Sequence, residues 1–228
     1  MADRVIDPKV IDPKVIDLSH SLDPTTPVYA GYPLVEIGVL ESTRYSIPGG
    51  RRALNSSRIS VGIHCGTHMD APFHFFEEGA TIDQVDLRHC VGETQLVHVD
   101  VPADGRIERS HLTNRADQIA RCGKVALSTG WAKQWGRPEY FTEHPVITPD
   151  AADFLIECGV HLVGVDFPSV DRAPFLTHVA LLSHNVLILE NLTNLSEIRA
   201  GSFQLVAVPL KFTGRDGSPV RAIALPTA

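Results

Sequence analysis

Residues 64–74 gather the side chains that are best suited to chemistry. They read His-Cys-Gly-Thr-His-Met-Asp-Ala-Pro-Phe-His, so three imidazoles and one carboxylate fall within eleven residues. Neutral imidazole nitrogens and carboxylate oxygens are ligands that Zn²⁺ and Mn²⁺ accept in proteins. A single histidine is more often an ordinary surface or core residue, but three of them beside an aspartate indicate a metal centre.

The backbone of this segment is predicted to be the end of a strand that turns into a loop. His64 and His68 are four residues apart, as in helical zinc motifs, but Gly66 and Pro72 disfavour a helix. The general-base glutamate of such motifs is also missing. In an extended backbone, His68 and Asp70 project to the same side.

A metal site of this kind needs ligands from elsewhere in the chain, and His178 and Glu190 are the best candidates. His178 lies in the predicted helix 174–182, and Glu190 follows the apolar run 186–189. A carboxylate in that position is costly to bury unless it is paired or coordinates an ion. The alternatives are that Glu190 is a surface charge at a strand end and that His184 takes the place of His178.

The loop 166–171 offers two further carboxylates, Asp166 and Asp171, after the predicted strand 162–165. Either one can orient a ligand histidine from outside the metal's own ligand set. The same loop also fits a proline turn with solvated carboxylates.

The elements that must position these groups change in character along the chain. The first half is rich in strands, whereas strands and helices alternate in the second half, which predicts one mixed α/β domain over residues 1–228. The repeated VIDPK units predict a loose arm over residues 1–14, and residues 23–50, rich in Pro and Gly, predict loops and short strands. The predicted strands are 15–18, 58–63, 95–101, 124–127, 162–165, 186–189, 203–210 and 219–225, and the predicted helices are 110–121, 149–157 and 174–182.

Composition narrows the class of protein. The chain has 43% hydrophobic and 21% charged residues, and its formal net charge of −7 disfavours a nucleic-acid partner. No apolar run approaches the ~18 residues of a membrane span, and no secretory signal is visible, so we expect no membrane partner and a cytoplasmic location. The four cysteines form no C-x-x-C pair, which disfavours a zinc ribbon and favours reduced thiols.

The string His64-x-Gly66-Thr67-His68-x-Asp70-x-Pro72-x-His74 resembles the signature of the metal-dependent cyclase/hydrolase superfamily, which contains bacterial kynurenine formamidases and isatin hydrolases. The likeness extends over nearly the whole chain, through the segments 17–29, 129–131, 166–171, 178–182 and 190–192. It implies a swivelling β/β/α fold and a homodimer or larger homo-oligomer. It also implies one or two Zn²⁺ ions, with Mn²⁺ as the alternative.

The resemblance also implies roles for individual residues. It makes His74 the general acid/base, and the metal ligands would be His64, His68, Asp70, His178 and Glu190. Asp70 would bridge two ions, with His178 and Glu190 completing the second site. The expected reaction is hydrolysis of a small aryl amide, with N-formylkynurenine as the first candidate substrate, by water whose pKa a divalent ion lowers from 15.7 to about 7.

Three other functions are compatible with the same residues. Within the family, the protein can be a cyclic amide hydrolase of the isatin type. A non-haem iron oxygenase is a second alternative, because His68-x-Asp70 with a distal histidine imitates the two-His-one-carboxylate triad, although His64 and Glu190 as extra ligands argue against its open coordination. The third is a metal-binding protein without turnover, which His74 beside the ligands disfavours.

Overall fold

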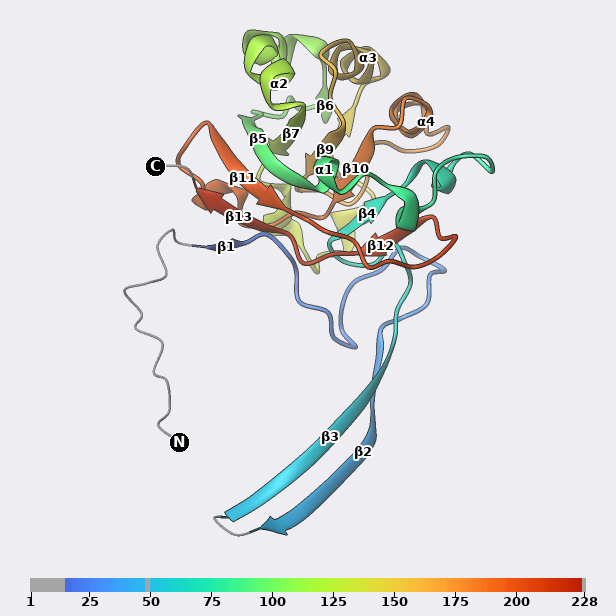
Figure 1. Cartoon of the computed structure of the whole chain (residues 1–228). Coiled ribbons are helices and arrows are strands. Elements are labelled where there is room, and N and C mark those ends of the chain that lie inside the picture. Colours follow the sequence, from blue (N-terminus) through green and yellow to red (C-terminus); the bar gives the residue numbers. More distant parts are fainter. Residues whose placement is uncertain (1–14, 48–49, 227–228) are drawn as a thin grey trace.

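A curled mixed sheet organises the computed structural model, which describes residues 15–47 and 50–226 (Figure 1). The predicted arm at residues 1–14 lies outside the described residues. The sheet contains nine described strands in the order β1 (Ile16–Asp17), β13 (Ile223–Pro226), β11 (Ser202–Val206), β5 (Val91–His98), β7 (Lys124–Ser128), β9 (Leu162–Val165), β10 (Leu187–Glu190), β4 (His68–Asp70) and β12 (Gly217–Pro219). The neighbours β5, β7, β9 and β10 run parallel, and the other pairs are antiparallel. The expected mixed α/β architecture is confirmed.

Helices cover one face of the parallel strands (Figure 1). They are α2 (Ala116–Cys122), α3 (Pro149–Glu157) and α4 (Leu176–Ser183), and the short α1 (Leu87–Cys90) precedes β5. Ile119, Leu155 and Leu181 from the three covering helices are fully buried in one core with strand residues such as Val125 and Val163. Parallel strands buried on both faces carry continuous apolar runs, which is why residues 162–165 and 186–189 were recognisable as strands.

The outer strands fold back over the other face of the sheet. Ile16 of β1 and Phe203 of β11 share a second core with Met69, Leu162 and Leu189 from the strands near the opposite edge. A strand layer therefore packs on the central strands, and the helices pack on their far side. This is the β/β/α layering that the resemblance implied.

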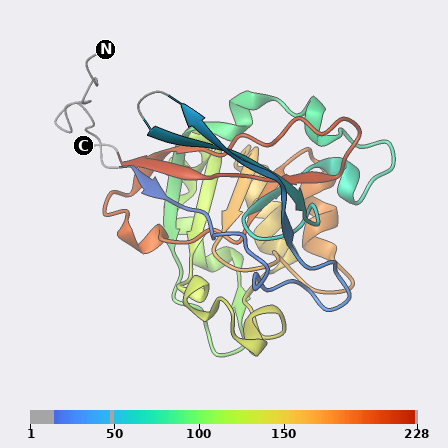
Figure 2. The ribbon, with the colours of Figure 1, turned by 90° about the horizontal axis from the view of Figure 1, so that it is seen from below.

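A long hairpin stands away from this body (Figure 1), and Figure 2 views the molecule from the hairpin's side. Its strands are β2 (Glu36–Ile47) and β3 (Gly50–Ser60), which pair antiparallel from Glu36↔Ser60 to Ile47↔Gly50. The prediction of loops and short strands over residues 23–50 was wrong for this part, because Pro24, Pro27 and Pro33 precede β2 rather than interrupt it. The strand predicted at 58–63 ends at Ser60.

Other bounds also differ from the prediction. The helix predicted at 110–121 is two 3₁₀ turns followed by α2, because Thr113 and Asn114 have low helix propensity in its middle. The strand predicted at 219–225 is split, since β12 pairs with β4 whereas β13 pairs with β11 and β1.

The remaining elements are the parallel pair β6 (Arg106–Ile107) and β8 (Val146–Ile147) and the 3₁₀ helices η2 (Pro72–His74), η3 (Ile82–Gln84), η4 (Arg109–His111), η5 (Thr113–Arg115), η6 (Trp131–Gln134), η7 (Pro138–Phe141) and η8 (Leu195–Glu197). Within the described part of the chain, no helix has the length and apolar character needed to cross a membrane.

Candidate metal centre

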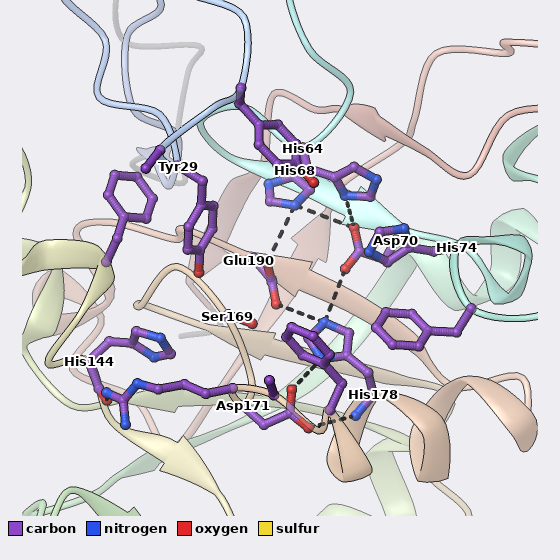
Figure 3. A pocket seen from close by; sticks show the side chains of 17 residues that line it. Tyr29, His64, His68, Asp70, His74, His144, Ser169, Asp171, His178 and Glu190 are labelled. Atoms are coloured by element: carbon purple, nitrogen blue, oxygen red, sulfur yellow. Dashed lines mark hydrogen bonds and ion pairs between the residues drawn. The ribbon is translucent and has the colours of Figure 1, made fainter.

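Two neighbouring strands and one helix bring the acidic and imidazole groups together (Figure 3). His68 and Asp70 lie in β4, where the extended backbone directs both side chains to one side, as predicted. Glu190 ends β10, which pairs antiparallel with β4 so that Glu190 is opposite His68. His178 approaches from α4. All four side chains are buried.

The distances describe a convergent cluster. His68 Nε2 lies 3.3 Å from Asp70 Oδ1 and 3.4 Å from Glu190 Oε2. His178 Nε2 lies 3.6 Å from Glu190 Oε1 and 3.8 Å from Asp70 Oδ2. These separations are too long for good hydrogen bonds, but they suit atoms that share a central ion.

The far nitrogens of both imidazoles are fixed by acceptors. His68 Nδ1 donates to the carbonyl oxygen of Gly66 at 2.8 Å, and His178 Nδ1 donates to Asp171 Oδ1 at 2.5 Å. The other oxygen of Asp171 accepts from the backbone N–H of Thr177 at 2.6 Å, which holds the carboxylate in place. Each Nε2 is therefore the nitrogen that faces the cluster, and in the neutral ring it carries the lone pair that a metal ligand requires.

The two carboxylates of loop 166–171 have different partners. Asp171 orients His178, as the sequence suggested for one member of the pair. Asp166 instead accepts from the backbone N–H groups of Thr129 and Gly130, at 2.9 and 2.7 Å, and so fixes a loop. His184 is exposed at the end of α4 and bonds the Ala180 carbonyl, so the structure favours His178 as the distal histidine.

His64 contacts two carboxylates at the edge of the cluster. Its Nδ1 donates to Asp70 Oδ1 at 2.7 Å, and its Nε2 donates to Asp216 Oδ2 at 2.6 Å. To bind an ion, His64 has to give up one of these contacts. Sequence reasoning missed Asp216, which precedes β12 and reaches the site because β12 pairs with β4. In the sequence it reads only as part of a Gly-Arg-Asp-Gly turn, which carries no signal of a site.

His74 lies beside the cluster rather than inside it. Its ring stacks on the ring of His64 with centroids 4.0 Å apart, and its Nδ1 is 3.9 Å from Asp216 Oδ2. The short helix η2 that carries it begins at Pro72 and follows β4 directly. All six predicted site residues are thus brought together around one cavity.

The acidic groups attract positive charge to this site. Burial opposes protonation of His64, yet the charges of Asp70 and Asp216 raise its pKa to about 10. Burial likewise opposes protonation of His178, but its hydrogen bond to Asp171 and the nearby charge of Glu190 raise its pKa to about 10. Burial and the charge of Asp70 raise the pKa of Glu190. Side chains that bind protons this strongly would also stabilise a divalent cation, which competes with the protons for the same ligand atoms.

His74 has the opposite character. Burial lowers the pKa of His74 to about 4, and the neighbouring His64 adds to the shift against the attraction of Asp70. The imidazole is therefore neutral at pH 7 and keeps a lone pair.

Two orphaned atoms test whether a metal ion fits. His68 Nε2 and Asp70 Oδ2 are buried and have no hydrogen-bond partner among the described residues. Buried polar atoms are rarely left this way, because the lost hydration is not repaid. A divalent cation at this point would satisfy both atoms, and imidazole nitrogen with carboxylate oxygen is a donor set for Zn²⁺ or Mn²⁺. Two groups of three residues each have ligand atoms within 4.8 Å of one another. One group is His64, His68 and Asp70, and the other is Asp70, His74 and His178.

A cavity of about 430 Å³ opens onto these groups. Much of its wall is aromatic and is formed by Tyr29, Phe75, Phe141 and Phe175. The histidines and carboxylates line another part of the wall. A cavity with apolar aromatic walls and a few convergent polar groups suits a small aromatic ligand.

Known proteins resemble this chain in sequence and in fold. The model of the Cyclase family matches residues 16–172. The kynurenine formamidase of Bacillus anthracis is 35% identical over 180 residues, which are 76% of this chain and 81% of the relative. Isatin hydrolase A of Labrenzia aggregata, solved with benzyl benzoate, has a TM-score of 0.80 at 25% identity and covers 94% of both chains. A predicted metal-dependent hydrolase of Bacillus stearothermophilus has a TM-score of 0.70 at 30% identity, covering 92% of this chain and 97% of its own.

Proposed function

The chain belongs to the Cyclase family, and from this premise we propose that it is an arylformamidase that hydrolyses N-formylkynurenine to kynurenine and formate. The relatives make it a hydrolase of amide bonds. The choice of an aryl amide rests on the aromatic walls of the cavity beside the cluster. The choice of the formyl group rests on the likeness to a kynurenine formamidase.

One observation carries the proposal: a neutral imidazole, His74, lies beside a cluster that fits a metal ion. A general base must be unprotonated at working pH and within reach of the water that it activates. The burial that lowers the pKa of His74 to about 4 meets the first condition. Its stacking against His64 meets the second, because it holds the ring at the edge of the cluster.

Each group has a defined part in the proposed reaction. His64, His68, Asp70, His178 and Glu190 would hold the metal ion or ions. When bound, a divalent cation lowers the pKa of water and stabilises the negative charge that develops on a carbonyl oxygen. Asp171 and the Gly66 carbonyl keep the imidazoles of His178 and His68 oriented.

His74 moves the proton in this scheme. It accepts a proton from the attacking water as the new C–O bond to the formyl carbon forms. It then donates that proton to the anilinic nitrogen as the C–N bond breaks, and the products are the free arylamine and formic acid, which ionises to formate at neutral pH. Proton transfer by a positioned imidazole is worth about 10²–10⁴-fold in rate.

Hydrolysis of a cyclic aryl amide of the isatin type is the second candidate. The fold likeness to isatin hydrolase A favours it, and the same groups can open a lactam ring. We further propose that the ion is Zn²⁺ or Mn²⁺, that the chain assembles into homodimers or larger homo-oligomers, and that it is located in the cytoplasm.

The test compares both substrates on the same protein. Chelator-treated protein is reloaded with Zn²⁺ or Mn²⁺, and formate release from N-formylkynurenine is measured beside ring opening of isatin. The proposal expects a kcat/KM at least about tenfold higher for N-formylkynurenine. Faster opening of isatin would replace it with the second candidate, and absence of turnover at every loading would favour a binding protein.

A further inference from the structure

Arg172 is a positive charge at the cavity that the mechanism above does not use. Among the described residues that line the cavity, it is the one lysine or arginine. It directly follows Asp171, the carboxylate that orients His178, so its backbone is tied to the catalytic region. Its side chain is exposed at the rim, and its Nη2 donates to the carbonyl oxygen of His144, which also lines the cavity.

The guanidinium has unused binding capacity. No carboxylate of the described residues lies within ion-pair distance of Arg172, whereas Arg88, Arg109 and Arg221 each pair with an acidic side chain. A guanidinium carries five N–H donors, and the bond to the His144 carbonyl uses one side of it. The rest of the planar fork can bind a carboxylate in a bidentate manner.

We infer that Arg172 binds a carboxylate on the substrate, so that the enzyme selects aryl amides that carry an acidic side chain over neutral ones. The inference rests on the proposed function, because it places the amide at the metal cluster and the acid at the rim. The aromatic walls formed by Tyr29 and Phe141 then hold the ring between these two positions. Arg172 is a specificity residue in this scheme and does not touch the reacting atoms.

Charge supports this orientation of the substrate. At the cluster end of the cavity, the charges of Asp70, Asp171 and Glu190 would largely offset that of a bound divalent cation, so little net attraction for a free carboxylate remains there. The rim offers the arginine instead. A substrate with one amide and one carboxylate is therefore directed into the cavity with its amide toward the cluster.

The test uses substrates matched except for the carboxylate. N-formylkynurenine is compared with N-formylkynuramine, which keeps the ring, the ketone and the amine but has no carboxylate. In Arg172→Gln, we expect KM for N-formylkynurenine to rise about 10–100-fold with kcat nearly unchanged, the loss of a charge-assisted bidentate contact. KM for N-formylkynuramine should stay within about twofold of the wild type.

Two further variants separate recognition from structure. Arg172→Lys keeps the charge and should recover part of the affinity for N-formylkynurenine. Arg221→Gln removes an arginine that pairs with Asp17 at β1 and should change neither KM. Thermal midpoints of all variants report whether loss of the bond to the His144 carbonyl disturbs the fold.

The outcomes are distinct. An equal rise in KM for both substrates, or no rise for either, would overturn the role of Arg172 while leaving the formamidase activity in place. If the wild type hydrolyses neither formyl compound, the proposed function itself fails, and the inference fails with it.

Discussion

Glu190 and His68 face each other across the antiparallel ladder of β10 and β4, with Glu190 Oε2 3.4 Å from His68 Nε2. Directly opposed residues in such a ladder have side chains on the same face, about 4.5–5.5 Å apart at Cβ. The register of two short strands thus converts distant sequence positions into neighbouring metal ligands. A shift of one residue would send Glu190 to the other face of the sheet.

Replacing His74 tests the general base. In His74→Gln, we expect kcat to fall about 10²–10⁴-fold, since the proton carrier is lost. Metal content, measured by elemental analysis, should not change, because the proposed ligands remain. His184→Gln alters an exposed histidine outside the cluster and should retain full activity. Loss of bound metal from His74→Gln would reassign His74 as a ligand.

Replacing Asp171 tests the orientation of His178. Asp171→Asn preserves the shape of the side chain but removes the charge that fixes the His178 tautomer. We expect the Kd for Zn²⁺, measured by calorimetry, to rise about 10–100-fold. Asp153→Asn, on the exposed side of α3, is the matched control and should leave Kd unchanged. An unaltered affinity in Asp171→Asn would argue against His178 as a ligand.

Gly79 tests the support beneath His74. A Cβ at Gly79 would lie 2.6 Å from the backbone carbon of Pro72 and 2.8 Å from the backbone nitrogen of Phe73, so the turn that carries His74 must move. We expect Gly79→Ala to lower kcat by about 10–100-fold through displacement of the base. Gly38→Ala, where a Cβ meets nothing within 4 Å, is the control. Equal activity of the two variants would contradict this account.

The burial of His144 makes us expect that the free energy of unfolding depends on pH. Burial lowers the pKa of His144 to about 4, from an ordinary value of 6.5. The unfolded chain therefore binds a proton as the pH falls below 6.5 while the folded chain does not, and stability is lost toward pH 4. The contribution is at most about 1.4 kcal/mol per pH unit.

Urea unfolding of the chelator-treated protein between pH 7.5 and pH 4.5 measures this loss. The free energy of unfolding of His144→Gln should decline less steeply with falling pH than that of the wild type. Parallel slopes for the two proteins would show that His144 does not contribute.

Much of the site could be predicted because its chemistry is concentrated in sequence. Four of the site residues lie within residues 64–74, so a single turn of the backbone brings them together: His64, His68, Asp70 and His74. Glu190 was recognisable because an acid that ends a fully apolar strand needs a reason to be there. Fold class followed from the alternation of apolar strands and helices.

The rest depended on pairings that no local pattern specifies. Asp216 reaches His64 only because β12 lies beside β4. The choice of Asp171 over Asp166 depended on which loop each carboxylate meets. The hairpin of β2 and β3 was missed because the many prolines and glycines of residues 23–50 favour loops. Pro24, Pro27 and Pro33 all precede β2, however, so they do not interrupt its pairing with β3.

Anomalous X-ray scattering from crystals of the Zn²⁺- or Mn²⁺-loaded protein would locate the ion that the proposed reaction requires. We expect a peak about 2.0–2.2 Å from His68 Nε2 and from an oxygen of Asp70, with His178 and Glu190 around the same ion or a second one bridged by Asp70. A protein that is active but holds no ion, or a peak that touches none of these four groups, would contradict this expectation.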